Sequence, residues 1–336
     1  MIALVPGYDH LWAMTDGYGT FEHADRTEPC RGHGYCTDDV ARVLVVASRE
    51  ATPSPVTREL ARGALRFVAD AQDVTGASRN RRSADGRWHG RHTMEDCWGR
   101  SLWGFGTASA ADGWMGQAAL AGFERGAQRR SAWPRATAFA ALGAAKVLAV
   151  DPWNRPAVEL LQDAADLLGG LTAGAGWTWP ERRLTYANAV LPEAMIAAGS
   201  ALARPALCAD GLALLDWLLL RETHDGHLSV TPASGAGPDD AAKGFDQQPI
   251  EVAAMADACA RAFAVDGSPR WLEGVRMSAA WFDGDNDGGV RMWDQASSGA
   301  HDGLMSGGVN MNQGAESTLA LLSTFQQAAR VAAVVA

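Results

Sequence analysis

Apolar residues recur along this chain at the three- and four-residue spacing of amphipathic helices, whereas the alternating pattern of strands is scarce. The spacing predicts about twelve helices, with proline and glycine between them. The expected ranges are 7–15, 38–49, 56–72, 95–108, 114–126, 133–149, 154–169, 187–203, 206–221, 247–264, 268–282 and 313–329.

The expected helices are of two alternating kinds. One kind, such as 56–72, is polar on one side, while the other, such as 187–203, is small and apolar nearly all round and should be buried. Each helix of the second kind follows a polar segment, as in GYCTDDVARVL or NMNQGAESTLALL. Six outer and six inner helices in alternation predict an all-α (α/α)6 toroid, one domain over residues 1–336. An α-solenoid or an irregular bundle is the alternative.

Composition narrows the function classes. The 336 residues include 29 basic and 39 acidic side chains, a net charge of −10, which argues against nucleic acid as a partner. No apolar run approaches the roughly 20 residues that span a bilayer. The first twelve residues, MIALVPGYDHLW, do not read as a signal peptide, so a cytoplasmic protein is expected. The five cysteines form no CxxC pair, which favours reduced thiols and no metal site.

Acidic residues stand in pairs at the starts of two expected inner helices. Asp38 with Asp39, and Glu95 with Asp96, each supply one carboxylate more than an N-cap needs. Glu316 begins the sixth inner helix, either as a capping-box residue or as a functional acid. Arginines follow at three- and four-residue spacing, which predicts intrahelical ion pairs that would lower the pKa of the acids.

Tryptophan is unusually frequent, with 13 against four tyrosines, and many tryptophans lie beside acids, amides or glycine. Sugar-binding clefts use such rings, since a pyranose face stacks on an aromatic plane while its hydroxyls bind carboxylates and amides. We therefore expect a sugar site at the mouth of the toroid. The candidate substrate-binding residues are Asp38, Glu95, Trp98, Trp177, Trp179, Tyr186, Asn188, Asp246, Gln247, Gln248, Trp293, Asn310, Asn312 and Gln313.

The acidic segment 283–294, WFDGDNDGGVRMWD in its context, has the spacing of a calcium loop, with Asp294 where the last ligand is usually Glu. No amphipathic EF-hand pair flanks it. The preferred interpretation is a loop that contributes Asp287, Trp293 and Asp294 to the cleft.

Five motifs in order, GYCTDDVAR, MEDCWGRSLWGFG, WTWPERRLTYANAVLPEAM, FDQQPIEVAAM and NMNQGAESTLALL, give the chain a family resemblance. It resembles a bacterial family of helical-toroid proteins often labelled glycosyltransferase, because some members are fused to a true glycosyltransferase domain. The resemblance implies an architecture similar to six-hairpin glycoside hydrolases and an association with mannosides. This chain departs from the family pattern at Val40, Cys97 and Trp98, where Asn, Ser and His are usual.

These observations predict a carbohydrate-active enzyme, a glycoside hydrolase acting on an oligosaccharide, and the resemblance implies that mannose is one of its sugars. Such chemistry needs one carboxyl group to protonate the leaving oxygen and a second to activate water or attack the anomeric carbon. The catalytic candidates are Asp39, Asp96, Glu181 and Glu316, with no cofactor. The alternatives are a non-catalytic sugar-binding accessory module and a polysaccharide lyase using Tyr186 and Asn188. Sugar epimerases commonly use a pair of histidine bases on inner helices, and histidines are absent there.

Overall fold

The computed structural model describes residues 5–171, 176–240 and 244–335, and these ranges contain twelve α-helices. The predicted helices are all present, with ends shifted by a few residues. They are α1 (Asp9–Ala13), α2 (Thr37–Ser48), α3 (Pro55–Ala71), α4 (Asp96–Ala108), α5 (Trp114–Gly126), α6 (Pro134–Val150), α7 (Arg155–Gly169), α8 (Val190–Ala201), α9 (Pro205–Arg221), α10 (Pro249–Asp266), α11 (Pro269–Asp283) and α12 (Ala315–Val335).

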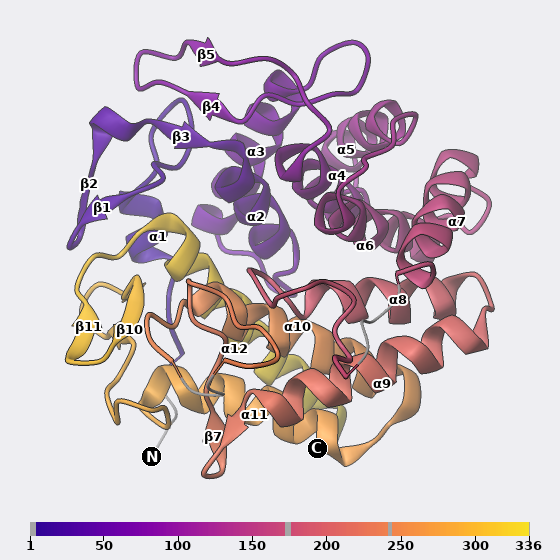
Figure 1. Ribbon diagram of the computed structural model, residues 1–336. Coiled ribbons are helices and arrows are strands. Elements are labelled where there is room, and N and C mark those ends of the chain that lie inside the picture. The colour runs from indigo at the N-terminus through magenta and orange to yellow at the C-terminus, as the bar shows by residue number, and fades with distance from the viewer. Residues whose placement is uncertain (1–4, 172–175, 241–243, 336) are drawn as a thin grey trace.

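Six of these helices form a closed inner ring. Each of α2, α4, α6, α8 and α10 packs against the next even-numbered helix, and α12 packs back against α2. Helices α3, α5, α7, α9 and α11 cover the ring from outside, while the short α1 lies against α12 (Figure 1). The (α/α)6 toroid expected from the alternation of two helix kinds is confirmed.

Small residues explain why the inner helices approach one another so closely. In α6, only small or apolar side chains line most of the helix, and residues from Arg135 to Ala144 are all buried. A Cβ on Gly106 would lie 2.2 Å from the carbonyl oxygen of Gly143, and a Cβ on Gly99 would lie 2.2 Å from that of Ala136. Helices α4 and α6 therefore touch backbone to backbone, and a larger residue at these glycines would force them apart.

The outer helices follow ordinary amphipathic rules. Helix α3 begins where the Ser54 hydroxyl accepts a hydrogen bond from the Thr57 amide, with Pro55 in the first turn. Its buried face includes Leu60, Leu65 and Val68. Helix α7 begins in the same way, with Asn154 as its cap. These helices shield the ring with one face and expose the other.

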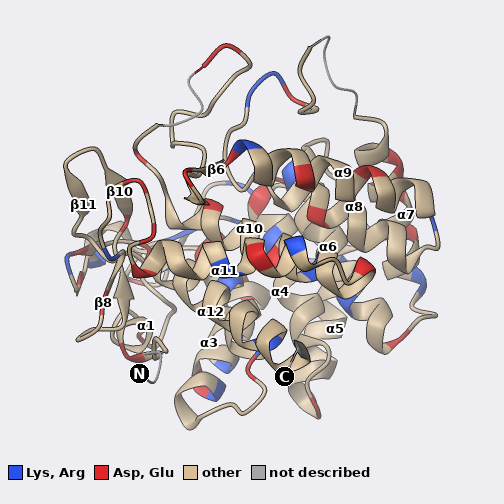
Figure 2. Cartoon of the chain, turned by 90° about the horizontal axis from the view of Figure 1, so that it is seen from below, with Lys and Arg blue, Asp and Glu red and all other residues tan. Residues whose placement is uncertain are grey.

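The connections are unequal in length at the two ends of the ring. Short segments lead from each inner helix to the next outer helix, whereas long segments lead into every inner helix except α6, which follows the short connection 127–133. All short strands lie in these long segments: β1 (Ala24–Asp25), β2 (Glu28–Pro29), β3 (Tyr35–Cys36), β4 (Arg81–Arg82), β5 (Trp88–His89), β6 (Thr223–His224), β7 (His227–Leu228), β8 (Trp293–Asp294), β9 (Gly299–Ala300), β10 (Gly303–Met305) and β11 (Gly308–Asn310). Figure 2 shows long loops along its upper edge and the C-terminus at its lower edge.

We call the end with the long connections, where the inner helices begin, the mouth. The opposite end, where the inner helices finish, is the far end. Loops gathered on one face of a rigid scaffold commonly form the functional site. Among the described residues, no helix is long and apolar enough to cross a membrane.

Candidate active site

Three arginines near the starts of consecutive inner helices organise the acids at the mouth. In α2, Arg42 binds Asp39 of the same helix and, at 2.7 Å, a carboxylate oxygen of Glu316 in α12. Asp39 is buried, and 42% of the Glu316 side chain is exposed. The intrahelical pair expected from the spacing is present. Glu316 does not act as a capping-box residue, because its carboxylate binds Arg42 of the neighbouring helix α2.

Burial shifts the pKa of Asp39 in the direction opposite to the shift that the sequence predicts. The sequence spacing predicts that Arg42 lowers the pKa of Asp39. In the structure, loss of solvent raises the pKa of Asp39 above its usual range, because burial outweighs the attraction of Arg42, and Glu316 and Glu22 add repulsion. One guanidinium thus faces several carboxyl groups, which favours retention of a proton at this cluster.

The second arginine, Arg100 in α4, lies between two further acids. Its nitrogens are 3.6 Å from oxygens of Asp38 and of Asp96. The other oxygen of Asp38 accepts from the Asn80 amide at 3.0 Å, and Tyr186 donates its hydroxyl to Asp96 at 2.9 Å. Asp38 does not cap α2, which begins at Thr37 without a side-chain cap.

The third arginine, Arg135 in α6, holds the segment that precedes α8. It donates to Glu181 at 2.7 Å, to the Asn188 side chain at 3.1 Å and to the carbonyl of Tyr186 at 2.5 Å. Its guanidinium also lies 4.8 Å from the centre of the Tyr186 ring. A single buried cation therefore fixes a carboxylate, an amide and an aromatic ring of one loop.

Glu251, near the start of α10, completes this arrangement. Its carboxylate accepts hydrogen bonds from the backbone amide of Ala187 and from both the backbone and side-chain amides of Asn188. Burial raises the pKa of Glu251 to about 7, although these donors oppose the rise. The sharp entry into α8, where Ala187 has a φ of 45°, is thus tied to the neighbouring inner helix.

A cleft of about 660 Å³ opens beside these groups. Its walls include the carboxylates Glu95, Asp96 and Glu181 and the aromatic side chains of Trp133 and Tyr186. Both aromatic residues are exposed, Trp133 to 59%. Such a volume, with convergent polar groups and exposed rings, is typical of small-ligand sites. Of the four catalytic candidates, Asp96 and Glu181 line the cleft, whereas Asp39 and Glu316 lie against Arg42.

The tryptophans proposed to stack on sugars lie elsewhere. Trp98, Trp179 and Trp293 are buried, and their indole N–H groups donate to the Gly126 carbonyl, Glu181 and Asp283 respectively. Trp177 is half-buried and packs edge-on against Trp217. Their stacking on a sugar stays a prediction, but in this structure these rings anchor loops, since a buried indole needs an acceptor.

The predicted amide contacts also hold loops in place. Gln247 is buried and receives a hydrogen bond from Trp281, while the Asn312 side chain accepts from the backbone of Arg26 and the Gln313 side chain from Ser297. The Asn310 side chain accepts from the backbone of Asn312. Asp246 and Gln248 are half-buried just before α10. None of these six lines the cleft between α4 and α6.

The acidic segment 283–294 does not converge on one point. Asp287 accepts from Gln247 at 2.7 Å and lies 2.9 Å from His227. Asp283 accepts from the Trp293 indole, and Asp294 from the backbone of Ala296. These contacts connect the segment to several different neighbours, so its acids act in this structure as loop anchors.

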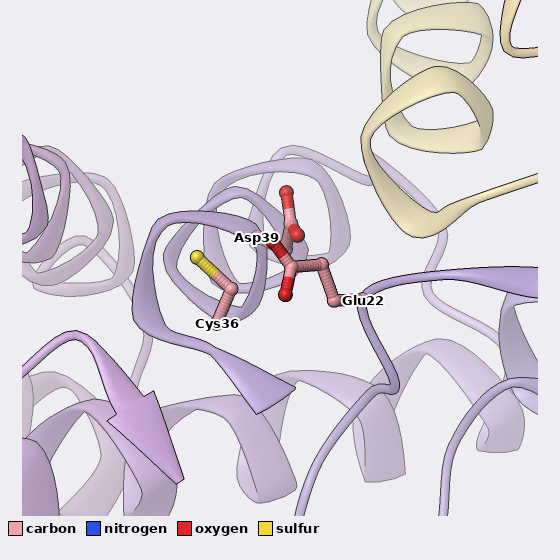
Figure 3. Close-up of side chains that lie close together, drawn as sticks. All are labelled: Glu22, Cys36 and Asp39. Atoms are coloured by element: carbon pink, nitrogen blue, oxygen red, sulfur yellow. The ribbon is translucent and has the colours of Figure 1, made fainter. Parts of the chain in front are cut away.

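One group of possible metal ligands occurs within the described residues. Ligand atoms of Glu22, Cys36 and Asp39 lie within 4.8 Å of one another (Figure 3). Arginines already compensate the acids, since Arg81 binds Glu22 and Arg42 binds Asp39. Burial raises the pKa of the Cys36 thiol well above its usual value. In the metal-free protein this group therefore contains a neutral thiol.

Sequence reasoning missed several residues of the cleft. Trp133 was placed only at the start of the expected helix 133–149, and neither Arg135 nor Asn80 was among the candidates. The available signal was the position of Trp133 directly before Pro134 at the start of an expected inner helix.

The fold defined by this ring is shared with solved enzyme structures. A sugar epimerase from a ruminal bacterium matches with a TM-score of 0.70 and 11% identity, covering 94% of each chain. The cellobiose 2-epimerase of Spirochaeta thermophila DSM 6192 matches with a TM-score of 0.68 and 11% identity over 97% of this chain and 94% of its own. An α-1,6-mannanase from Salegentibacter sp. HEL1_6 matches with a TM-score of 0.62 and 12% identity, over 96% and 98%.

These similarities establish the (α/α)6 architecture over nearly the whole chain. No family model matches the sequence, and no curated protein matches it. At identities this low, the assignment of chemistry depends on the residues of the site.

Proposed function

We propose that this protein is a carbohydrate-processing enzyme, and specifically a glycoside hydrolase that binds an oligosaccharide in the cleft between α4, α6 and the segment before α8. The observation that carries the proposal is the pair Asp96 and Glu181, two carboxylates that line one cleft walled by exposed Trp133 and Tyr186. The structural neighbours support it, since they include sugar epimerases and α-mannanases.

The proposed reaction divides between these two acids. One donates a proton to the glycosidic oxygen as the bond to the anomeric carbon breaks, and the other accepts a proton from the water that attacks this carbon or forms the bond itself. Tyr186 and Arg100 position Asp96, and Arg135 positions Glu181. Asp38 and Asp39 do not line the cleft, so we assign them supporting roles.

A mannose-containing substrate is the finer part of the proposal. One matching structure is an inactive α-1,6-mannanase variant in complex with α-1,6-mannotriose, in which two adjacent aspartates are replaced by asparagine. This chain has an adjacent pair at Asp38 and Asp39. If that pair performed the chemistry here, the Asp38→Asn change would abolish turnover while Glu181→Gln would not.

The test is a substrate panel with matched variants. The parent protein is incubated with α-1,6-mannotriose, other manno- and gluco-oligosaccharides and cellobiose, with products separated by chromatography and sugar epimers followed by NMR. We expect oligosaccharide cleavage, lowered by a factor of about 10²–10⁴ in Asp96→Asn and in Glu181→Gln. Glu59→Gln, an exposed acid on α3, is the control and should be fully active.

Two outcomes would contradict the proposal. Epimerisation of cellobiose without cleavage of any oligosaccharide would retain the carbohydrate class and exclude hydrolysis. Binding of oligosaccharides with no turnover of any kind would assign the protein to sugar-binding accessory modules.

A further inference from the structure

The far end of the ring contains a second cavity that the proposed reaction does not use. It measures about 440 Å³ and lies among the C-terminal parts of α6, α8, α10 and α12. This volume falls within the range of small-molecule sites. A neighbouring cavity of about 770 Å³ shares Arg49, Lys146, Gln327 and Arg330 with it.

Basic residues outnumber acids around the far-end cavity. Its basic lining residues are Arg49, Lys146, Arg261 and Arg330, and its acidic lining residues are Glu193 and Asp257. Figure 2 shows basic and acidic segments interleaved near the centre of the molecule, beside α10 and α6. The cavity therefore carries an excess of positive charge.

Ion pairs neutralise only two of these cations. Arg49 lies 2.9 Å from Asp257 and also donates to the Ser323 hydroxyl at 2.9 Å. Arg261 lies 3.0 Å from Glu193. Both acids of the cavity are thereby occupied.

Lys146 and Arg330 remain without a counter-ion. Within the described part of the chain, neither forms a hydrogen bond or an ion pair. Burial opposes the charge of the half-buried Lys146 most strongly, and the arginines Arg49, Arg261 and Arg330 repel it. Glu193 attracts Lys146 but forms no ion pair with it. Partial negative charge at helix C-termini favours cations there. No backbone carbonyl of a described residue, however, accepts from Lys146.

A free acceptor points to the same cavity. Gln327 is buried and donates its amide N–H to Asp257, but its side-chain oxygen receives no hydrogen bond from any described residue. A buried acceptor without a donor is uncommon in folded proteins. The cavity thus presents two unpaired cations together with an acceptor suited to a hydroxyl group.

We propose that the far-end cavity binds the phosphate group of a small hydroxylated phosphomonoester, with Lys146 and Arg330 donating to the phosphate and Gln327 accepting from a hydroxyl. Arginine and lysine together are common phosphate donors, and charge-assisted hydrogen bonds of this kind are strong. The ligand could carry its phosphate on a sugar, or the site could take free phosphate. Both share the same anionic chemistry.

The test is isothermal titration calorimetry on the full chain at constant ionic strength, with inorganic phosphate and with a hexose 6-phosphate. We expect one site per chain. Lys146→Met and Arg330→Gln should each weaken binding at least about tenfold, the loss expected for one charge-assisted hydrogen bond. Arg87→Gln in the β4–β5 connection at the mouth, an exposed arginine that does not line the cavity, is the matched control and should bind like the parent.

The two ligands separate the possible sources. Tighter binding of the hexose phosphate, reversed by Gln327→Leu, assigns the site to a phosphorylated sugar, whereas equal affinity assigns it to free phosphate. Absence of binding up to about 10 mM of either ligand, or unchanged affinity in both charge variants, overturns the proposal. Arg330 is exposed on α12, so its substitution keeps the test valid even if Lys146→Met folds poorly.

Discussion

The two ends of the inner ring differ in how their basic side chains are paired with acids. At the mouth, Arg42, Arg100 and Arg135 each contact carboxylates, and no arginine of this set is left alone. At the far end, cations exceed acids, and Lys146 and Arg330 have no partner within the described residues. A buried charge is costly unless it is paired. At the mouth each of the three arginines already contacts a carboxylate. At the far end Lys146 is half-buried and Arg330 is exposed, so an anion from outside can reach both.

The largest effect on stability should come from removing the arginine that holds Asp39 and Glu316 together at the mouth. Arg42→Met removes the only basic side chain that contacts Asp39 and Glu316 in the described structure. Breaking a buried pair by removing one partner costs about 3–5 kcal/mol. Urea unfolding monitored by circular dichroism measures this loss.

Arg62→Met is the matched control, because Arg62 and Glu59 have the same three-residue spacing on an exposed helix face. It should change the free energy of unfolding by less than about 1 kcal/mol. Equal effects of the two substitutions would show that Asp39 already holds a proton and needs no guanidinium.

A smaller effect, on activity, is expected at the third arginine. Arg135→Gln removes the contacts that hold Glu181, Asn188 and the Tyr186 carbonyl together. If Arg135 positions Glu181 for catalysis, kcat should fall by about 10²-fold while KM changes little, because displacement of a catalytic group acts mainly on the reaction step. Steady-state kinetics on the oligosaccharide that the parent cleaves gives both values. A rise in KM alone would make Arg135 a binding residue.

A pH-dependent effect should appear at Glu222, which precedes β6 near the mouth. Its carboxyl group accepts from the Thr231 backbone and hydroxyl, yet burial raises its pKa from 4.5 to about 8. The folded protein therefore keeps a proton that the unfolded chain releases. The stabilising contribution is complete below pH 4.5 and is lost as the pH rises to about 8.

Thermal unfolding of the parent and of Glu222→Gln is measured at roughly pH 5–9, which covers most of the interval between the two pKa values of Glu222. It tests whether stability falls as the pH rises. The melting temperature of the variant should fall less steeply with pH than that of the parent. A parallel decline in both proteins would assign the pH dependence to other acids, of which Glu251 is the first candidate.

The smallest effect, with the opposite pH trend, is expected at the far end. Burial and neighbouring arginines lower the pKa of Lys146 from 10.5 to about 8. The unfolded chain then binds the proton more tightly, so stability should rise between pH 8 and 10.5. Lys146→Met should abolish this rise and should raise the free energy of unfolding at neutral pH, because it removes the partly buried charge. A large loss at neutral pH would reveal a partner that compensates the lysine.

The fold was predictable from the sequence because each inner helix carries its own evidence of burial. Helix α8, for example, is apolar on all sides, and its polar residue Glu193 lies one turn inside. Alternation with amphipathic helices such as α3 then leaves few architectures. The ring closure between α12 and α2 could be predicted only by counting six helices of each kind.

The candidate site was predictable only along single helices. Spacing identified the pair of Asp39 and Arg42, because three residues of helix place them on one face. It could not identify the contact of Arg42 with Glu316, or that of Tyr186 with Asp96 across 90 residues. The structural role of the tryptophans could not be predicted from the sequence either. A ring that stacks on a ligand and a ring such as Trp179, whose N–H anchors a loop, have the same local sequence signature.

The direct backbone contact between α4 and α6 constrains how the cleft could adapt to ligands of different size. Gly99 meets Ala136 at the level of the cleft, and Gly106 meets Gly143 deeper in the ring. At these two points no side chain separates the helices, and nearby Trp103 of α4 packs on Phe139 of α6. Close packing leaves little room for these two walls to separate. Under the proposed function, the width of the cleft would then be set by the opposite wall, the loop bearing Glu181 and Tyr186, and this loop would determine which substrates fit.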